Sequence, residues 1–131
     1  MSNFALDLRK FAKKAGDNAE KVVRSVILDV DYSVIDMSPR DKGRFVNNWN
    51  VNLNSIDKST TEAVDLSGDA SKARANAALL NFKIGDTAYI SNSLPYAQRL
   101  EDGYSKKAAS GMVKVTLAQY QTFIKNAVRK L

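Results

Sequence analysis

The 131-residue sequence contains no cysteine and no histidine, and it has only two prolines. Without thiolates and imidazoles the chain cannot form a zinc finger, bind haem through histidine or hold an iron–sulfur cluster. Nucleophilic catalysis by cysteine and a Ser-His-Asp triad within this chain are excluded as well. We therefore expect no cofactor and no metal site. The lack of cysteine is typical of a reducing compartment.

Long apolar runs are also missing. No stretch approaches the ~18 apolar residues that cross a bilayer, and within residues 1–7 an acid precedes any basic residue, unlike the order in a signal peptide. The composition, with 44% apolar and 26% charged residues, is that of a folded globular protein. We expect a single domain over residues 1–131 that stays in the cytoplasm or joins an assembly built there.

Motifs for enzymatic chemistry are scarce. The sequence has neither of the phosphate-binding glycine loops, G-x-x-x-x-G-K and G-x-G-x-x-G. Asp29 and Asp31 are two positions apart, so on a helix they do not face each other, and no Asp-rich glycine loop follows them. The side chains of the adjacent Glu101 and Asp102 diverge and do not indicate a general acid–base pair. We predict that the protein is not an enzyme.

Acidic residues are missing from the last part of the chain. Residues 1–102 hold 14 basic and 14 acidic side chains, and the rest holds six basic and no acidic ones, so the net charge of +6 belongs to residues 103–131. Such a segment suits a polyanion or a solvated helix face. Arg129 and Lys130 also suit the negative end of a helix dipole. The candidates for contact with DNA or an acidic partner are Lys106, Lys107, Lys114 and Lys125.

Apolar residues recur at steps of three and four from residue 3 to residue 37, which predicts a long helix. Gly16 is unfavourable in a helix interior by ~1 kcal/mol relative to alanine. The segment is therefore either one helix that is locally destabilised at Gly16 or two helices that meet near this residue. Ser38-Pro39 ends the helix, because a residue before proline is pushed out of the helical region. Further helices are predicted over residues 69–82, with Asp69 as N-cap, 95–102 and 112–131.

Residues 48–56 alternate Trp, Val, Leu and Ile with Asn and Ser, which predicts a strand with one buried face. A second strand is expected over residues 86–92. The polar residues 57–68 between these elements predict a loop, and the pattern leaves open whether residues 60–66 form a strand. The fold class is α+β: a long N-terminal helix and a C-terminal helix packed on a small, mainly antiparallel sheet.

Two segments together resemble the tail-completion and neck family of tailed bacteriophages, the head–tail joining or minor tail component proteins. The first is Ser38-Pro39-Arg40-Asp41-Lys42-Gly43-Arg44-Phe45, followed by Trp49. The second runs from Tyr89-Ile90-Ser91-Asn92 through Pro95-Tyr96-Ala97 and Glu101-Asp102-Gly103 to Gly111-Met112-Val113. The order and spacing match over almost the whole chain, except residues 57–75. Lys42 stands where the family frequently has threonine, and Ala109 where proline is frequent.

The resemblance implies a structural virion protein without catalytic residues, assembled in the host cytoplasm and located in the virion neck or tail. It implies a homo-oligomeric ring, expected to be hexameric, between the capsid portal and the tail. The expected partners are other neck or portal-adaptor, stopper, and tail-terminator or tail-tube proteins, with transient non-specific contact with double-stranded DNA and none with a membrane. The positions shared with the family, interpreted as fold and assembly determinants, are Pro39, Asp41, Gly43, Arg44, Trp49, Asn92, Pro95, Tyr96, Glu101, Gly103 and Gly111.

Two further hypotheses accompany this interpretation. Arg44 and Glu101 lie in the two matching motifs with opposite charges, so we expect an ion pair between them, within or between subunits. The alternative function is a basic monomeric or dimeric protein that binds double-stranded DNA in an unrelated role. A peripheral membrane helix over residues 113–131 is disfavoured, because its polar face is only mildly cationic.

Overall fold

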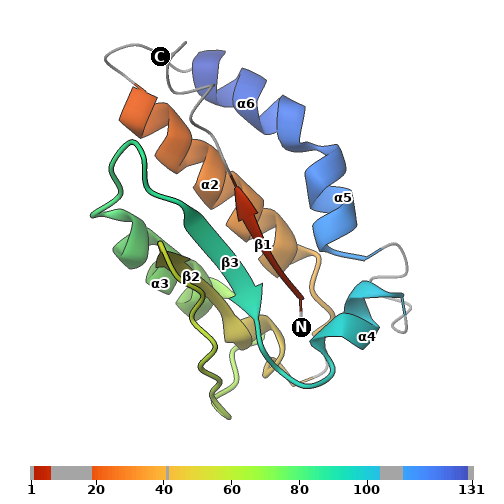
Figure 1. Cartoon of the computed structure of the whole chain (residues 1–131). Helices are drawn as coiled ribbons and strands as arrows, with labels where there is room; N and C mark the ends of the chain where they lie inside the picture. The colour runs from red at the N-terminus through yellow and green to blue at the C-terminus, as the bar shows by residue number, and fades with distance from the viewer. Residues whose placement is uncertain (1, 7–18, 41, 104–110, 130–131) are drawn as a thin grey trace.

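The computed structural model describes residues 2–6, 19–40, 42–103 and 111–129. The fold is α+β, with a three-stranded antiparallel sheet in the order β1-β3-β2. Figure 1 shows this sheet and the helices beside it. In chain order the elements are β1 (Ser2–Leu6), α2 (Ala19–Asp36), a 3-10 turn η2 (Val46–Asn48), β2 (Trp49–Leu53), α3 (Asp69–Leu79), β3 (Ala88–Asn92), α4 (Ala97–Glu101), α5 (Val113–Ala118) and α6 (Tyr120–Arg129).

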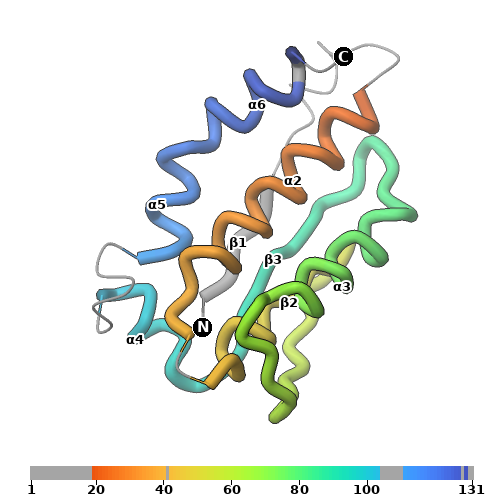
Figure 2. The backbone as a smooth tube through the Cα atoms, turned by 180° about the vertical axis from the view of Figure 1, so that it is seen from behind, coloured from red at the N-terminus to blue at the C-terminus, as the bar shows by residue number. Residues whose placement is uncertain are grey.

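The helices form a layer on one face of the sheet. Figures 1 and 2 together show α2 between α3 on one side and the α5–α6 pair on the other. Helix α2 contacts α3 on one side and α5 and α6 on the other, so a large part of its surface is apolar and buried. Val26, Val30 and Val34 are fully buried in the core, where Trp49 and Ile90 of the sheet also lie. The central helix therefore joins both halves of the molecule into one core.

The predicted helix over residues 3–37 is wrong at its start. Residues 19–36 form α2 as expected, but Ser2–Leu6 is the edge strand β1. Phe4 and Leu6 stand in register opposite Ile90 and Ala88 of β3, and this pairing uses the backbone groups along that edge of β3. Strand formation here depends on a distant partner, which a helical spacing of apolar residues does not reveal. Residues 7–18, which include Gly16, lie outside the described residues.

The other predicted elements are confirmed with shorter bounds, with two corrections. The predicted C-terminal helix divides into α5 and α6 at Gln119. Asp69 is not the N-cap of α3, because it is the first helical residue and Gly68, with φ of 80°, precedes it. The carboxylate of Asp65 accepts the Ala70 N–H at 2.8 Å and performs this role from outside the helix. Residues 60–66 form no strand and belong to the loop between β2 and α3.

Side-chain amides hold this loop against the sheet. Asn48, Asn50 and Asn52 lie two residues apart around β2. Their amide nitrogens donate to the carbonyl oxygens of residues 61, 59 and 55 at 3.0, 2.9 and 3.1 Å, respectively. Ser91 of β3 donates to the carbonyl of Asp57 at 3.0 Å. The alternating asparagines therefore hold the loop over residues 54–68, which we call the covering loop, against the sheet. Their hydrogen bonds provide partners for backbone carbonyls in a segment without regular secondary structure.

No helix in the described part of the chain has both the length and the apolar character needed to span a bilayer.

One polar residue in the core lacks a compensating contact. Asp31 on α2 is 1% exposed, and neither carboxylate oxygen has a hydrogen-bond partner in the described structure. Burial raises the pKa of Asp31 to about 7, although Arg74 and Lys72 act in the opposite direction. The folded protein therefore keeps this proton at pH values where the unfolded chain, with a pKa near 3.8, has released it.

We predict that stability falls as the pH rises from about 4 to about 7, and that Asp31→Asn removes most of this loss. The effect is on the order of a few kcal/mol, since each pKa unit corresponds to about 1.4 kcal/mol. Urea unfolding at pH 5 and pH 8 measures the difference. The control is Asp69→Asn, which alters an exposed carboxylate and is expected to keep the wild-type pH dependence. Equal pH dependence in Asp31→Asn and wild type would contradict the prediction.

Candidate functional site

The two segments that carry the family resemblance meet at one end of the molecule. A surface hollow of about 370 Å³ lies between them, and we call it the motif hollow. Four of the positions shared with the family line it, and they come from both segments. The lining residues are Pro39, Lys42, Gly43, Arg44, Phe45, Tyr96 and Leu100.

Aromatic side chains connect the hollow to the core. Trp49 is 1% exposed, and its indole N–H donates to the Ser38 hydroxyl at 2.7 Å. Ser38 in turn donates to the carbonyl of Val34 at 2.6 Å, so the turn after α2 is tied to the start of β2. Phe45 packs edge-on against Trp49 and at a tilt against Tyr96, with ring centroids 5.9 and 6.0 Å apart. The hollow thus has a rigid apolar wall.

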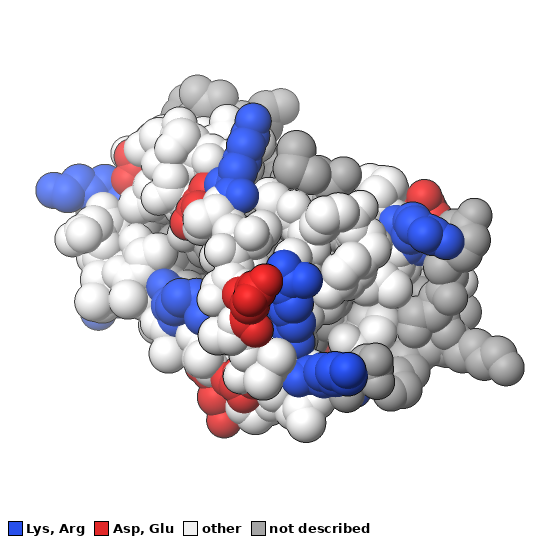
Figure 3. Space-filling model, turned by 90° about the horizontal axis from the view of Figure 1, so that it is seen from below, with Lys and Arg blue, Asp and Glu red and all other residues white. Residues whose placement is uncertain are grey.

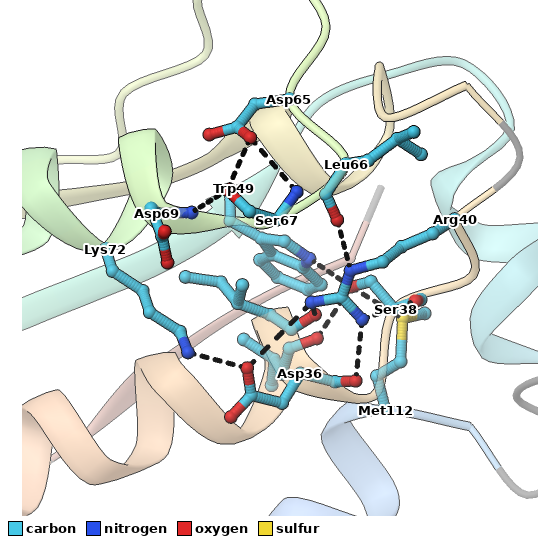
Figure 4. A network of polar contacts seen from close by, with 12 residues as sticks. Asp36, Ser38, Arg40, Trp49, Asp65, Leu66, Ser67, Asp69, Lys72 and Met112 are labelled. Atoms are coloured by element: carbon cyan, nitrogen blue, oxygen red, sulfur yellow. Dashed lines mark hydrogen bonds and ion pairs between the residues drawn. The ribbon is translucent and has the colours of Figure 1, made fainter.

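Arg40 caps the C-terminus of α2. Its guanidinium donates to the carbonyl oxygens of Ile35 and Asp36 at 3.0 and 2.9 Å, in the last turn of the helix, where carbonyls lack the usual helical partners. The Ile35 carbonyl also accepts the backbone N–H of Ser38 at 3.1 Å. The same group donates to the carbonyl of Leu66 at 2.8 Å, which fixes the end of the covering loop beside the helix (Figure 4). Sequence analysis did not single out Arg40. A basic residue just past a Ser-Pro helix stop was the available signal.

Gly43 lies where the covering loop passes closest to the turn. Its φ is +87°, and a Cβ atom there would be 2.7 Å from the Asp65 backbone. The carbonyl of Gly43 accepts the N–H of Asp65 at 3.0 Å. Asn47 donates to the carbonyl of Ala63 at 3.1 Å and holds the same stretch of loop. The glycine is therefore required by both its backbone conformation and this close approach.

Asn92 joins the second segment to the first. Its side chain is fully buried, and its amide donates to the carbonyl of Phe45 at 2.9 Å. Its Oδ1 accepts the N–H of Leu94 at 3.3 Å, which sets the turn out of β3. Pro95 follows in this turn and is exposed. The end of β3 is thus fixed directly to the backbone that lines the hollow.

Glu101 caps the start of α5 from the preceding helix. Its carboxylate is buried and accepts the backbone N–H groups of Met112 and Val113 at 2.9 Å each and of Lys114 at 3.1 Å. Negative charge at a helix N-terminus is favourable, and hydrogen bonds to a charged group are the stronger kind. Gly111, with φ of +83°, lies against Glu101, whose carbonyl oxygen a Cβ atom would approach to 2.7 Å. Gly103 donates its N–H to Leu100 and ends α4. The flanking residues Gly103 and Gly111 therefore each have a fixed backbone position.

The expected ion pair between Arg44 and Glu101 is wrong within the chain. Arg44 Nε donates to the carbonyl of Thr61 at 3.3 Å, and the Glu101 carboxylate is occupied by backbone N–H groups. The Glu101 carboxylate is buried because it accepts hydrogen bonds from the N-terminus of α5. The prediction relied only on the opposite charges of Arg44 and Glu101, and these do not indicate such a capping role. Of the other predicted positions, Asp41, Lys106 and Lys107 lie outside the described residues.

The basic residues of α5 and α6 lie on the surface. Lys114, Lys125 and Arg129 are all exposed. Lys125 and Arg129 are four positions apart on α6, so they share one helix face. Arg129 is in the last turn of α6, as its predicted role at the negative end of the helix dipole requires. These helices therefore offer a cationic surface, separate from the face that packs on α2.

Within the part of the chain that the structure describes, no cluster of three or more acidic side chains could hold a metal ion. Comparison with protein-family profiles, with curated proteins and with solved structures finds no match for this chain. The resemblance to the neck family therefore stays a prediction from the two motifs. What the structure adds is their position in space.

We predict that Glu101→Gln lowers the free energy of unfolding by about 2 kcal/mol, because an amide loses the charge and one of the two acceptor oxygens facing three N–H groups. The neighbouring Asp102→Asn is the control. Asp102 is exposed and bonded only to Gln98 in the described contacts, so its loss is expected to be within about 0.5 kcal/mol. Urea denaturation measures both. Equal losses in the two variants would show that the helix cap contributes nothing.

We predict that Gly43→Ala destabilises the fold by about 3 kcal/mol or more, because it adds a backbone clash to the strain of a positive φ. Gly85→Ala is the matched control. Gly85 also has a positive φ, +104°, but nothing lies within 4 Å of a Cβ atom built there. Its loss is expected to be about 1 kcal/mol. Thermal and urea unfolding of both variants test the difference, and similar losses would rule out the close approach of the loop as the cause.

Proposed function

We propose that this chain is a structural virion protein of a tailed bacteriophage. In this proposal it forms a homo-oligomeric ring, expected to be hexameric, in the neck or tail-completion region, where the ring joins the capsid portal to the tail and lets DNA pass. The observation that carries the proposal is the meeting of the two motif segments around one surface hollow.

The roles of the motif residues support an assembly function. Gly43, Asn92 and Glu101 hold backbone segments in place through a close approach or hydrogen bonds. Pro39, Arg44 and Tyr96 are partly exposed on the surface around the hollow. Such a division, with some residues shaping a surface and others lining it, suits a contact between proteins. The expected neighbours are the portal adaptor or stopper on one side and the tail terminator or tail tube on the other.

Contact with DNA fits the charge of the C-terminal helices. Lys114, Lys125 and Arg129 are exposed, and residues 103–131 contain no acid. DNA has to slide through a neck, and weak contacts with phosphates, screened by salt, suit this task better than base recognition. We propose that this surface lines or borders the channel, with Lys106 and Lys107 as further contacts.

The same cationic surface favours the alternative function, a monomeric or dimeric protein that binds double-stranded DNA in an unrelated role. Under that alternative the chain forms no ring and binds duplex DNA tightly. Its affinity should also fall steeply with salt, because each neutralised phosphate releases counterions. A neck protein is expected to bind free DNA weakly.

The test combines the mass in solution, negative-stain imaging and DNA binding at several salt concentrations. Closed rings with a central channel are expected, alone or after mixing with the portal or tail-terminator protein of the same phage. Binding of free duplex DNA at physiological salt is expected to be no tighter than the ~10⁻⁴–10⁻⁶ M typical of non-specific contacts. Tight DNA binding without a ring in any of these mixtures would overturn the proposal and support the alternative.

A further inference from the structure

The motif hollow combines an apolar floor with a basic rim. Phe45, Tyr96 and Leu100 supply apolar surface, while Lys42 is exposed and Arg44 is half-buried at the edge. Among the described residues Arg44 donates through Nε to the carbonyl of Thr61, and no bond from its terminal nitrogens is found there. Neither cation forms an ion pair with an acid in the described part of the chain. The hollow is therefore suited to an apolar side chain with a carboxylate beside it.

A segment of that chemistry lies next to the hollow in the same chain. Residues 62–66, which we call the apolar ridge, expose Val64 by 59% and Leu66 by 54%. Glu62 is exposed as well. The carboxylate of Asp65 is already bonded to Ser67 and Ala70, so Glu62 is the free acid of the ridge in the described contacts. Charge and apolar character both match the hollow.

The ridge is held in one conformation. Its backbone is fixed by hydrogen bonds from Asn47 to Ala63, from Asp65 to Gly43 and from Arg40 to Leu66. Apolar side chains that are exposed on a fixed backbone mark an interaction surface more strongly than those on a free loop, because little entropy is lost on binding. The bond from Asp65 to Gly43, which lines the hollow, also places the backbone of the ridge beside it.

Ridge and hollow thus adjoin at Gly43, and they are complementary in charge and in apolar character. A surface that contains both can pair with a copy of itself about a two-fold axis, so that each ridge enters the hollow of the other molecule. Figure 3 shows basic and acidic side chains next to one another at this end of the molecule, rather than a block of one sign. We infer that the chain forms a two-fold dimer in which Val64 and Leu66 of each copy fill the other's motif hollow, and Glu62 pairs with Lys42 and Arg44.

This dimer has a consequence for assembly. It covers the hollow, so a chain in the dimer cannot use that surface for any other protein. This consequence rests on the proposed function: in a neck protein the dimer is a storage form that keeps free subunits from assembling early, and it dissociates when a partner competes for the hollow. The inference of a dimer stands without the neck proposal, because it rests on the ridge and the hollow alone.

Charge reversal tests the pairing. Glu62→Lys and the double variant Lys42→Glu/Arg44→Glu each place like charges across the interface, and both are expected to be monomers by sedimentation equilibrium. An equimolar mixture of the two restores opposite charges at both contacts, so it is expected to give a heterodimer of twice the 14.4 kDa chain mass. Lys83→Glu, an exposed lysine in the turn between α3 and β3, is the control and should remain a dimer. Circular dichroism checks that each variant is folded.

The outcomes separate this inference from the proposed function. A wild-type chain that stays monomeric at its highest soluble concentration overturns the dimer, and so does a mixture of variants that does not associate. Because Glu62→Lys lacks the dimer that covers the hollow, it is expected to form rings at least as readily as the wild type, and rings that form less readily in this variant overturn the storage role. A wild-type dimer lost in both charge variants and regained in the mixture supports the dimer, whatever its behaviour with portal or tail proteins.

Discussion

The end of α2 is the constraint on which the rest of this structure depends. Ser38 accepts a hydrogen bond from the Trp49 indole and donates to the last turn of the helix, while Arg40 bonds two terminal carbonyls and the backbone of Leu66. These contacts link the central helix, the start of β2 and the covering loop within three residues of chain. A helix terminus left without partners in a core would lose several hydrogen bonds. The residues around the motif hollow are therefore positioned by the hydrogen bonds that complete the C-terminus of α2.

The same requirement recurs elsewhere in the fold. Glu101 supplies acceptors for the first N–H groups of α5, and Asp65 does so for α3 from outside the helix. Asn48 and Asn50 provide partners for a loop that has no strand neighbour. In each case a side chain from a distant or irregular segment completes the hydrogen bonding of backbone that would otherwise be unpaired. Many polar residues of this chain are structural for that reason.

This use of polar residues shapes the functional interpretation. The motif positions divide into residues that hold backbone, such as Asn92 and Glu101, and residues that remain on the surface around a hollow, such as Arg44 and Tyr96. The proposed assembly function is consistent with this division, because a preorganised surface loses less conformational entropy on binding. The exposed basic residues of α5 and α6 are a separate feature of the molecule, so the proposed contacts with DNA and the proposed contacts with proteins can be altered independently.

The sequence alone determined those features that depend on local periodicity. The apolar stripe predicted a helix over residues 3–37, which is confirmed from residue 19 onward, and Ser38-Pro39 marked its end. The alternation from Trp49 predicted β2. Only the tertiary structure decided that Ser2–Leu6 pairs with β3, that Asp31 is buried and that Glu101 caps α5 instead of pairing with Arg44. Each of these joins or encloses residues far apart in the chain. The spacing of residues along a sequence predicts which of them lie on the same face of a helix or strand. The hydrogen-bond partner of a buried polar group depends instead on which distant segments pack around it.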